Sequence, residues 1–208
     1  MRQAIKDLGI DYLVHFTQAD NLSSIFNHGI LPVSLQRSRN ISAKRNDLFR
    51  MDFCEGATST SIRFPNYRLF FKFRMNDRSV DWVVLALSTD LLHEKQCAFC
   101  TDNAANSNIS QQALRDRMGP DALRRMFDDV PGKPPRSVLG TPDSSPTNPQ
   151  AEVLVFGEIE PQYIGAVIFE NNTTSAKYRH LLPENLQVEV LDGFFAPRKD
   201  YAHWRREE

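Results

Sequence analysis

A twenty-residue span rich in proline constrains the fold of this chain more than any other feature. Residues 131–150 hold six of the twelve prolines, together with Gly, Ser, Thr and Asn. Proline fixes φ and lacks a backbone N–H, so this span cannot form regular helix or sheet. A loop of this length in a compact domain is usually functional or disordered. We therefore predict a long irregular segment that leads directly into a strand at Ala151.

That strand begins with a charged residue. Residues 151–156 read A-E-V-L-V-F, so the Glu152 carboxylate stands at the start of an apolar run. Charged side chains are rarely buried unless something pairs with them. Two interpretations stay open: Glu152 faces solvent at the edge of the sheet, or it lies in a pocket.

The remaining patterns predict an α+β fold with a mixed sheet in one domain of 208 residues. Thr17 is expected to begin a helix and Gly29 to end it, with a return strand at Ile30 and Leu31. Mobile loops are expected near 34–50 and 131–150. Further strands are predicted at 12–16, 57–62, 81–88, 166–170 and 188–191, and helices at 65–76, at 175–182 and, interrupted at Gly119-Pro120, within 110–128.

Composition favours a cytoplasmic protein without a membrane span, and we expect a monomer. Hydrophobic residues make up 41% of the chain, enough for a core, but no apolar run approaches the ~20 residues that span a bilayer. The first residues contain no apolar stretch typical of a secretory signal. Three cysteines cannot all pair, which fits a reducing compartment. Cys97 and Cys100 have redox or metal spacing but no second ligand pair nearby, so we interpret them as structural and expect no metal.

Charge is distributed unevenly along the chain. Residues 37–78 contain ten basic and four acidic side chains, a net charge of +6, whereas the whole chain carries −1. Seven Phe and Tyr residues are interleaved with these charges. Cations that follow phosphates and rings that stack on unpaired bases are typical of single-stranded nucleic-acid binding. A solvated basic face with its aromatics in the core explains the composition equally well.

His15 and Arg50 are the other candidates for chemistry. A histidine at the end of a strand is commonly a core residue bonded to the backbone. Followed by Thr17 and a helix start, it can also present an imidazole, a hydroxyl and free N–H groups to an amide- or phosphate-bearing ligand. Arg50, in a basic loop, is either a solvated side chain or a third member of the same site.

Several short motifs occur in order along most of the chain. They are His15-Phe16-Thr17, Asn21-Leu22, Gly29-Ile30-Leu31, Arg50, Ser61-Ile62-Arg63-Phe64-Pro65, Phe99-Cys100-Thr101-Asp102 and Gln150-Ala151-Glu152-Val153-Leu154-Val155. Through these motifs the sequence resembles the DarT family, bacterial toxins that ADP-ribosylate single-stranded DNA. Gln150 and Glu152 also match the wider Gln-x-Glu pattern of ADP-ribosyltransferases.

The resemblance implies an ADP-ribosyltransferase-like split mixed β-sheet core of six strands surrounded by helices, with NAD as donor. It implies single-stranded DNA as acceptor and a macrodomain antitoxin as partner. Guanine is favoured over thymine as the modified base, and the modification would block DNA replication. No tyrosine of the related His-Tyr-Glu pattern stands in the middle strand, where Ser59 or Ser61 is found.

Carried onto this sequence, the resemblance also assigns roles. Glu152 would stabilise the positive charge that develops on the ribose as nicotinamide leaves, and would accept the proton of the attacking base. Arg50 would steady phosphates or polarise the base. The residues expected at NAD are His15, Thr17, Asn21, Gly29, Arg37, Tyr67 and Phe71, and those expected at DNA are Arg63, Arg68, Lys72, Arg74, Lys133 and Arg136.

Three alternatives stay open. The same fold could modify protein or RNA, the chain could be a nucleic-acid-binding module without catalysis, or it could be an inactive relative. The presence of His15, Arg50 and Glu152 together argues against the last of these.

Overall fold

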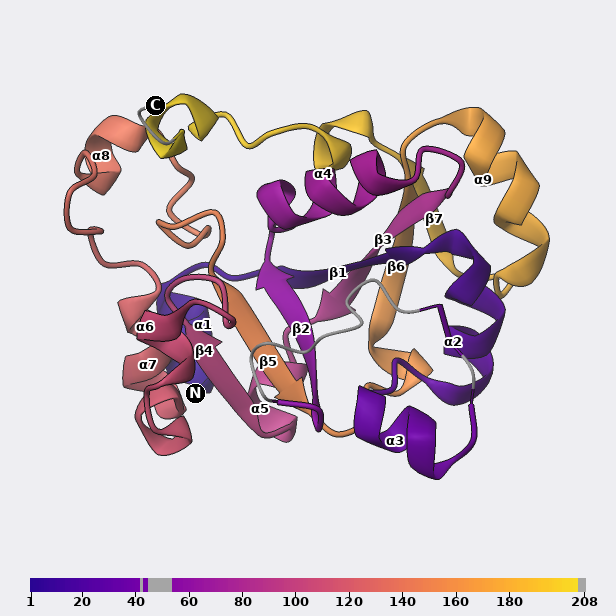
Figure 1. Ribbon diagram of the computed structural model, residues 1–208, viewed down its shortest axis with the longest axis horizontal. Helices are drawn as coiled ribbons and strands as arrows, with labels where there is room; N and C mark the ends of the chain where they lie inside the picture. The colour runs from indigo at the N-terminus through magenta and orange to yellow at the C-terminus, as the bar shows by residue number, and fades with distance from the viewer. Residues whose placement is uncertain (42, 45–53, 206–208) are drawn as a thin grey trace.

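The molecule is built on one mixed sheet of seven strands, in the order β4-β5-β2-β1-β3-β6-β7 (Figure 1). It is seen in a computed structural model that describes residues 1–41, 43–44 and 54–205. Neighbouring strands are antiparallel, except β6 and β7, which are parallel. The strands are β1 (Tyr12–Gln18), β2 (Ala57–Ile62), β3 (Trp82–Ser88), β4 (Cys97–Cys100), β5 (Glu152–Phe156), β6 (Ile164–Phe169) and β7 (Gln187–Val190).

The sheet is split between β1 and β2. β1 pairs with β3 along all seven of its residues, but with β2 only at Leu13 and Val14. Beyond Val14 the ladder between β1 and β2 stops, and the two strands diverge in Figure 1. The split core implied by the resemblance is therefore present, with seven strands instead of six. The sequence analysis did not predict β4, a four-residue edge strand beside β5.

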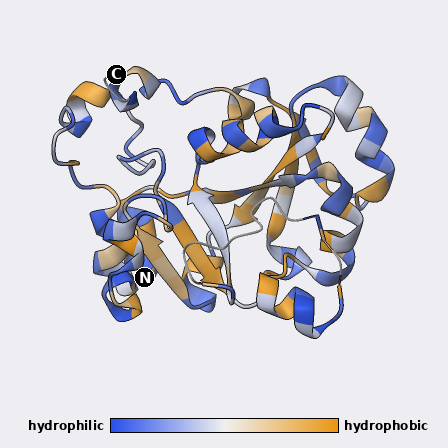
Figure 2. Cartoon of the chain, in the orientation of Figure 1, coloured by the Kyte–Doolittle hydropathy of each residue, from blue (hydrophilic) through white to orange (hydrophobic). Residues whose placement is uncertain are grey.

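Both faces of the sheet are covered, which explains the continuous apolar run in β3. Successive strand side chains point to opposite faces. Val83 and Leu85 join the larger apolar cluster, while Val84 joins a smaller cluster with Phe70 of α4 (Tyr67–Asn76) and Phe195. Figure 2 shows the same arrangement as hydrophobic strands flanked by helices of mixed character.

The helices are short, and α4 is the longest at ten residues. It begins after Asn66, whose side-chain oxygen accepts the N–H of Leu69 at 3.3 Å. Within the described residues, no helix combines the length and apolarity needed to cross a membrane. The other described α-helices are α1 (Arg2–Asp7), α2 (Leu22–His28), α3 (Val33–Ser38), α5 (Leu91–Glu94), α6 (Ser107–Ser110), α7 (Gly119–Arg125), α8 (Arg136–Leu139) and α9 (Asn172–Tyr178). Turns of 3-10 helix lie at Ala19–Asn21, Leu114–Arg117, Pro161–Tyr163, Arg179–Leu181, Asp192–Phe195 and Tyr201–Trp204.

Most predicted elements are confirmed to within a few residues, and Gly29 ends the first helix as predicted, but the start of that helix at Thr17 is wrong. Thr17 lies in β1, and a 3-10 turn separates it from α2, which begins at Leu22. The Thr17 hydroxyl accepts a hydrogen bond from the Asn21 amide at 3.0 Å instead of capping a helix. The predicted return strand is also wrong, because Ile30 forms only an isolated bridge with Ile159.

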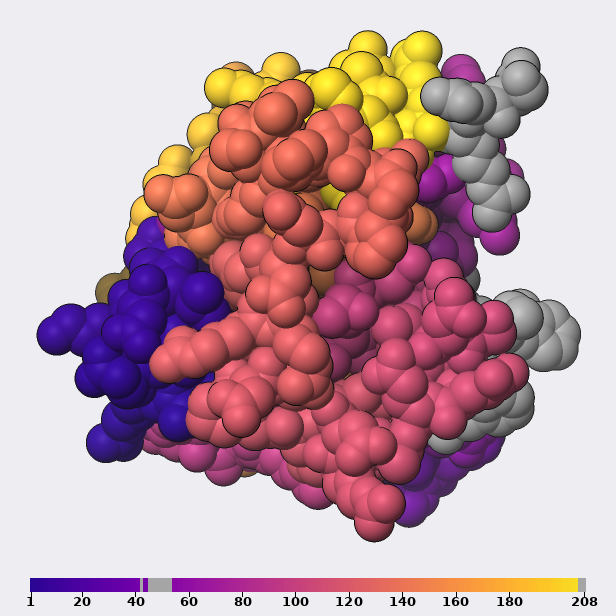
Figure 3. Space-filling model, turned by 90° about the vertical axis from the view of Figure 1, so that its left-hand side faces the viewer, coloured from indigo at the N-terminus to yellow at the C-terminus, as the bar shows by residue number. Residues whose placement is uncertain are grey.

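The proline-rich loop is more ordered than its composition predicts. It contains α8, and the Arg136 guanidinium donates to the carbonyls of Pro142 (2.7 Å) and Asp143 (2.8 Å) and to the Thr147 hydroxyl (3.0 Å). Residues 192–205, here called the C-terminal strap, lie against it. Arg198 of the strap donates to the carbonyls of Pro146 and Thr147 at 2.7 and 2.5 Å. Figure 3 shows the loop in salmon beside the yellow strap.

Candidate active site

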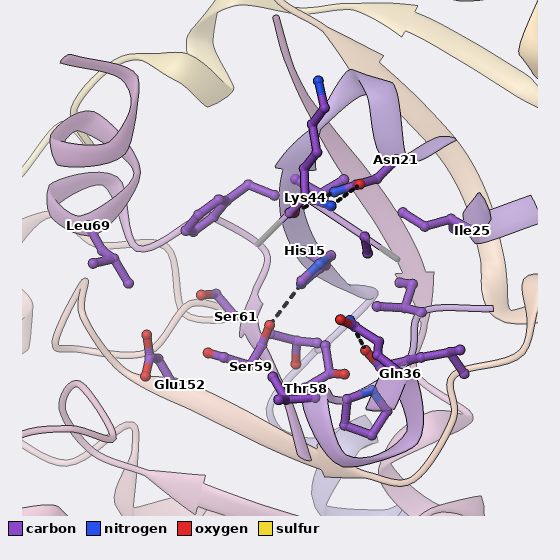
Figure 4. Close-up of a pocket in the computed structure, with 18 of the residues that line it drawn as sticks. His15, Asn21, Ile25, Gln36, Lys44, Thr58, Ser59, Ser61, Leu69 and Glu152 are labelled. Carbon is purple, nitrogen blue, oxygen red and sulfur yellow. Dashed lines mark hydrogen bonds between the residues drawn. The ribbon is translucent and has the colours of Figure 1, made fainter. Parts of the chain in front are cut away.

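A cavity of about 340 Å³ lies where β1 and β2 separate (Figure 4). Both strands contribute to its walls, together with α2, α3, α4 and the turn after β4. A volume of this size suits part of a small-molecule ligand. The residues predicted from sequence that line it are His15, Thr17, Asn21, Gly29, Lys72 and Glu152.

Glu152 is buried at the wall of this cavity and is only 4% exposed. It begins β5, between β2 on one side and Cys100 of β4 on the other. Its Oε2 accepts the backbone N–H of Ala104 at 2.9 Å, and its Oε1 lies 3.3 Å from the Asn66 amide and 3.4 Å from the Asn103 amide. N–H donors stabilise the ionised form of a carboxylate. The pocket interpretation of Glu152 is therefore correct, and the solvent-facing one is wrong.

His15 connects the two halves of the split sheet. Its Nδ1 lies 2.9 Å from the Ser59 carbonyl oxygen, one residue past the last β1–β2 pair (Figure 4). A carbonyl only accepts, so Nδ1 carries the hydrogen and Nε2 is the acceptor of the neutral ring. The ring is bonded to the backbone, as the first interpretation expected, and it also lines the cavity. The helix start at Thr17 that the second interpretation assumed is absent, and a role of His15 in ligand binding stays a prediction.

Asn21 holds the chain that closes one side of the cavity. Its Oδ1 accepts the Lys44 N–H at 2.9 Å, and its Nδ2 donates to the Lys44 carbonyl at 2.9 Å. This pair of bonds imitates a strand pairing, and the Lys44 ammonium adds an ion pair with Asp20. Asn21 therefore positions the segment containing Ala43 and Lys44, which also line the cavity.

Gly29 allows the chain to turn tightly at the cavity wall. Its φ is +79°, in the region that favours glycine, and a Cβ there would lie 2.7 Å from the Ile159 carbonyl oxygen. The backbone of Ile30 bonds to Ile159 in both directions, at 2.8 and 3.0 Å. Only glycine can approach this closely without moving the bridge.

Some predicted NAD residues are not brought to the cavity. The Arg37 guanidinium pairs with Glu55 at 2.6 Å, Tyr67 is half-buried and Phe71 is 56% exposed, and none of the three lines the cavity. For Tyr67 and Phe71 the reason is the geometry of α4, in which Leu69 and Phe73 line the cavity instead. The role of Arg37, which lies on α3, stays a prediction. Arg50 lies outside the described residues.

Most of the cations predicted to bind DNA have partners within the fold. Arg74 pairs with Glu170 and donates to the Phe195 carbonyl at 2.6 Å, and Arg136 holds the proline-rich loop, so both have structural roles. Lys72 lines the cavity. The other contacts are Arg63 with Asp11, the Arg68 guanidinium with the Trp204 carbonyl at 3.2 Å, and the Lys133 ammonium 5.7 Å from the centre of the Trp204 ring.

The cysteines behave as structural residues. Burial raises the pKa of Cys97 and of Cys100 to about 12, so both thiols stay protonated at neutral pH. The thiol of Cys100 accepts a hydrogen bond from the Arg117 guanidinium at 3.6 Å.

The sequence patterns did not reveal the hydrogen-bond donors that surround the Glu152 carboxylate. Asn66, Asn103 and Ala104 reach it from α4 and from the turn after β4. Asn66 could have been found only as a helix cap, from its place before the helical pattern. Its second contact depends on a distant part of the chain.

Comparisons with known proteins agree with this architecture. The split mixed sheet around a cavity lined by a buried carboxylate matches solved structures with the DarT ADP-ribosyltransferase fold. A model of the DarT family, described as ssDNA thymidine ADP-ribosyltransferase, matches residues 63–196, more than half of the chain. The chain therefore belongs to the DarT family. The matched stretch contains Glu152 but begins after His15, Thr17, Asn21 and Gly29.

Solved structures share the fold at low sequence identity. Thermosipho africanus DarTG in complex with ADP-ribose has a TM-score of 0.60 and 17% identity, and covers 89% of this chain. This chain spans about half (51%) of that DarTG chain. Thermus sp. 2.9 DarT in complex with carba-NAD+ has a TM-score of 0.58 and 13% identity, covering 90% of this chain and 98% of its own. The same DarT in complex with ADP-ribosylated ssDNA has a TM-score of 0.58, with 12% identity and 90% and 97% coverage. A sequence comparison with curated proteins gives no match.

Proposed function

We propose that this chain transfers ADP-ribose from NAD to a base of single-stranded DNA. The observation that carries the proposal is Glu152, a buried carboxylate that lines the same cavity as His15 in a DarT-family fold. The related Thermus DarT structures with NAD+ and with ADP-ribosylated ssDNA support both substrates.

The cavity fits the polar groups of NAD. The hydroxyl of Thr58 is buried there without a hydrogen-bond partner among the described residues, so a ligand group would satisfy it. The His15 ring and the Thr17 hydroxyl would contact the nicotinamide and its ribose. Gly29 lets the backbone approach the dinucleotide closely. Arg37, which now pairs with Glu55, would have to exchange that partner to reach a phosphate.

Glu152 would act on the bond that breaks. As the bond between nicotinamide and the ribose C1′ breaks, positive charge develops on the ribose, and a nearby carboxylate stabilises it. A base nitrogen then bonds to C1′ and loses its proton, which Glu152 accepts. Arg50 is proposed to polarise the base or steady the phosphates. The acceptor must be unpaired, because a duplex hides its nitrogen.

The acceptor base and the biological outcome are part of the proposal. The sequence resemblance favours guanine, while the description of the matching family names thymidine, so thymine is the alternative base. An ADP-ribose group on a template base would block replication. A macrodomain hydrolase, as in DarTG, is the proposed antitoxin. No metal is proposed, and a cytoplasmic monomer stays a prediction.

The test is incubation of the purified chain with NAD labelled in its adenylate and with oligonucleotides that contain a single G or a single T. Mass spectrometry should find an added ADP-ribose on single-stranded DNA, none on the duplex, and released nicotinamide. If ADP-ribose were added only to RNA or to protein, the acceptor would not be DNA, contrary to the proposal. Oligonucleotide binding without nicotinamide release would leave a binding module, contrary to the proposal.

A further inference from the structure

Two asparagines, Asn66 and Asn103, contact the Glu152 carboxylate. Each also accepts a backbone N–H, so the two side chains make the same pair of contacts. The Asn66 Oδ1 accepts the N–H of Leu69, and its Nδ2 lies 3.3 Å from Glu152 Oε1. The Asn103 Oδ1 accepts the N–H of Ala105 at 2.9 Å, and its Nδ2 lies 3.4 Å from the same carboxylate oxygen. Each side chain thus ties a backbone turn to the carboxylate.

The orientation of both amides follows from these contacts. A backbone N–H can only donate, so the atom facing Leu69 or Ala105 must be the amide oxygen. The NH₂ group of each asparagine must then face Glu152. Asn66 is 1% exposed, so its amide has no solvent to replace this contact.

We infer that Asn66 and Asn103 are positioning residues that aim the Glu152 carboxylate at the cavity and keep it ionised. The inference rests on the proposed function of Glu152. Asn66 acts from the N-terminus of α4 and Asn103 from the turn after β4, so the carboxylate is held by two separate elements. The Ala104 N–H donates to the other oxygen of the Glu152 carboxylate at 2.9 Å.

Two neutral amide donors suit a carboxylate that must act as a base. A carboxylate must be ionised before it can accept a proton, and N–H donors favour the ionised form without adding a formal charge. The described titratable groups around Glu152 are Cys100, opposite it on β4, and His15 and Lys72, which line the same cavity. Both amide contacts are long, which is common before substrate binds.

The test replaces each asparagine by aspartate. Asn66→Asp and Asn103→Asp keep the oxygen that bonds to Leu69 or Ala105, and they exchange the amide donor for a second carboxylate. With labelled NAD and a single-stranded oligonucleotide, we expect kcat to fall about tenfold or more in each variant, since one donor to a charged group is lost. The KM for NAD should stay within about threefold, and the acid limb of the pH–kcat profile should move to higher pH.

Asn171→Asp is the matched control. Asn171 caps α9 through the same Oδ1 contact, to the N–H of Thr174 at 2.9 Å, but it is exposed and does not line the cavity. Its kcat and pH profile should be those of the wild type. Unchanged kcat and pH profile in Asn66→Asp and Asn103→Asp would overturn the inference and leave both residues as caps. If either variant fails to fold, Asn66→Ser or Asn103→Ser keeps a capping oxygen and carries the same test.

A measurement without substrate separates this inference from the proposed function. The side-chain carboxyl carbon of Glu152, assigned in ¹³C NMR with Glu152→Gln, should titrate at higher pH in Asn66→Asp than in the wild type. The same titration midpoint in both proteins would overturn the inference. Absence of transfer to any oligonucleotide by the wild type would instead refute the proposed function and leave this NMR result standing.

Discussion

At the scale of single residues, the proposed reaction depends on the Glu152 carboxylate. Glutamine has nearly the same shape as glutamate but no charge. In Glu152→Gln, the remaining oxygen can still accept the Ala104 N–H. We expect transfer to fall about 10³-fold, because the group that stabilises charge on the ribose is lost. Folding should survive, at a cost of about 1–3 kcal/mol, because the Asn66 and Asn103 amides lose the oxygen that accepts them. Labelled NAD and thermal unfolding measure the two effects, and labelling at the wild-type rate would contradict the mechanism.

Gly29 gives a second prediction at this scale. Gly29→Ala places a Cβ 2.7 Å from the Ile159 carbonyl oxygen at a φ of +79°, so the Ile30 bridge must shift. We expect the free energy of unfolding to drop by about 1–3 kcal/mol, with weaker NAD binding. Gly193→Ala is the control, because a Cβ there meets nothing within 4 Å. Equal urea midpoints for the two variants would show that the turn tolerates a side chain.

At the scale of elements, α4 connects the cavity to the proposed DNA surface. Lys72 lines the cavity and Arg68 reaches the C-terminal strap. We expect Arg68→Gln with Lys72→Gln to weaken binding to single-stranded DNA. The slope of log K against log salt should flatten by about 1.4, that is, 0.7 for each phosphate contact. Lys6→Gln on α1 is the control, and an unchanged slope in the double variant would exclude both residues from the interface.

The same elements explain how far the sequence could be interpreted. The apolar runs of the sequence predicted β3 and β5, because a strand that is buried on both faces needs a continuous apolar run. It missed β4, whose four residues are too few for a period and carry a cysteine spacing that suggests other chemistry. The resemblance predicted that His15 and Glu152 belong to one site, and both line the same cavity. It could not find Asn103, because that contact with Glu152 spans 49 residues and depends on how the sheet and the turn after β4 come together.

At the scale of the whole molecule, the C-terminal strap and the proline-rich loop meet at a buried ion pair. Arg198 pairs with Asp200 at 2.5 Å, and Asp200 also accepts the Trp204 ring N–H at 2.8 Å. Arg198 in turn holds the carbonyls of Pro146 and Thr147. The family match ends at residue 196, so Arg198, Asp200 and Trp204 lie beyond it, whereas Pro146 and Thr147 lie within it. The loop that leads to Glu152 is thus fixed by the last part of the chain.

This junction makes stability depend on pH. Burial alone would raise the pKa of Asp200, but the hydrogen bonds and charge of Arg198, with the Trp204 N–H, outweigh it and lower that pKa. A carboxyl with a lowered folded-state pKa stabilises the fold above its unfolded value, about 3.9, and loses this contribution as pH falls through the folded value. Arg198→Met leaves Asp200 buried without its cation and should cost about 3–5 kcal/mol at pH 7. Urea unfolding from pH 7 to 2 should show the wild type losing this contribution only below about pH 3.9, where Arg198→Met has no ion pair to lose. Parallel curves for the two proteins would mean that Arg198 does not set the charge state of Asp200.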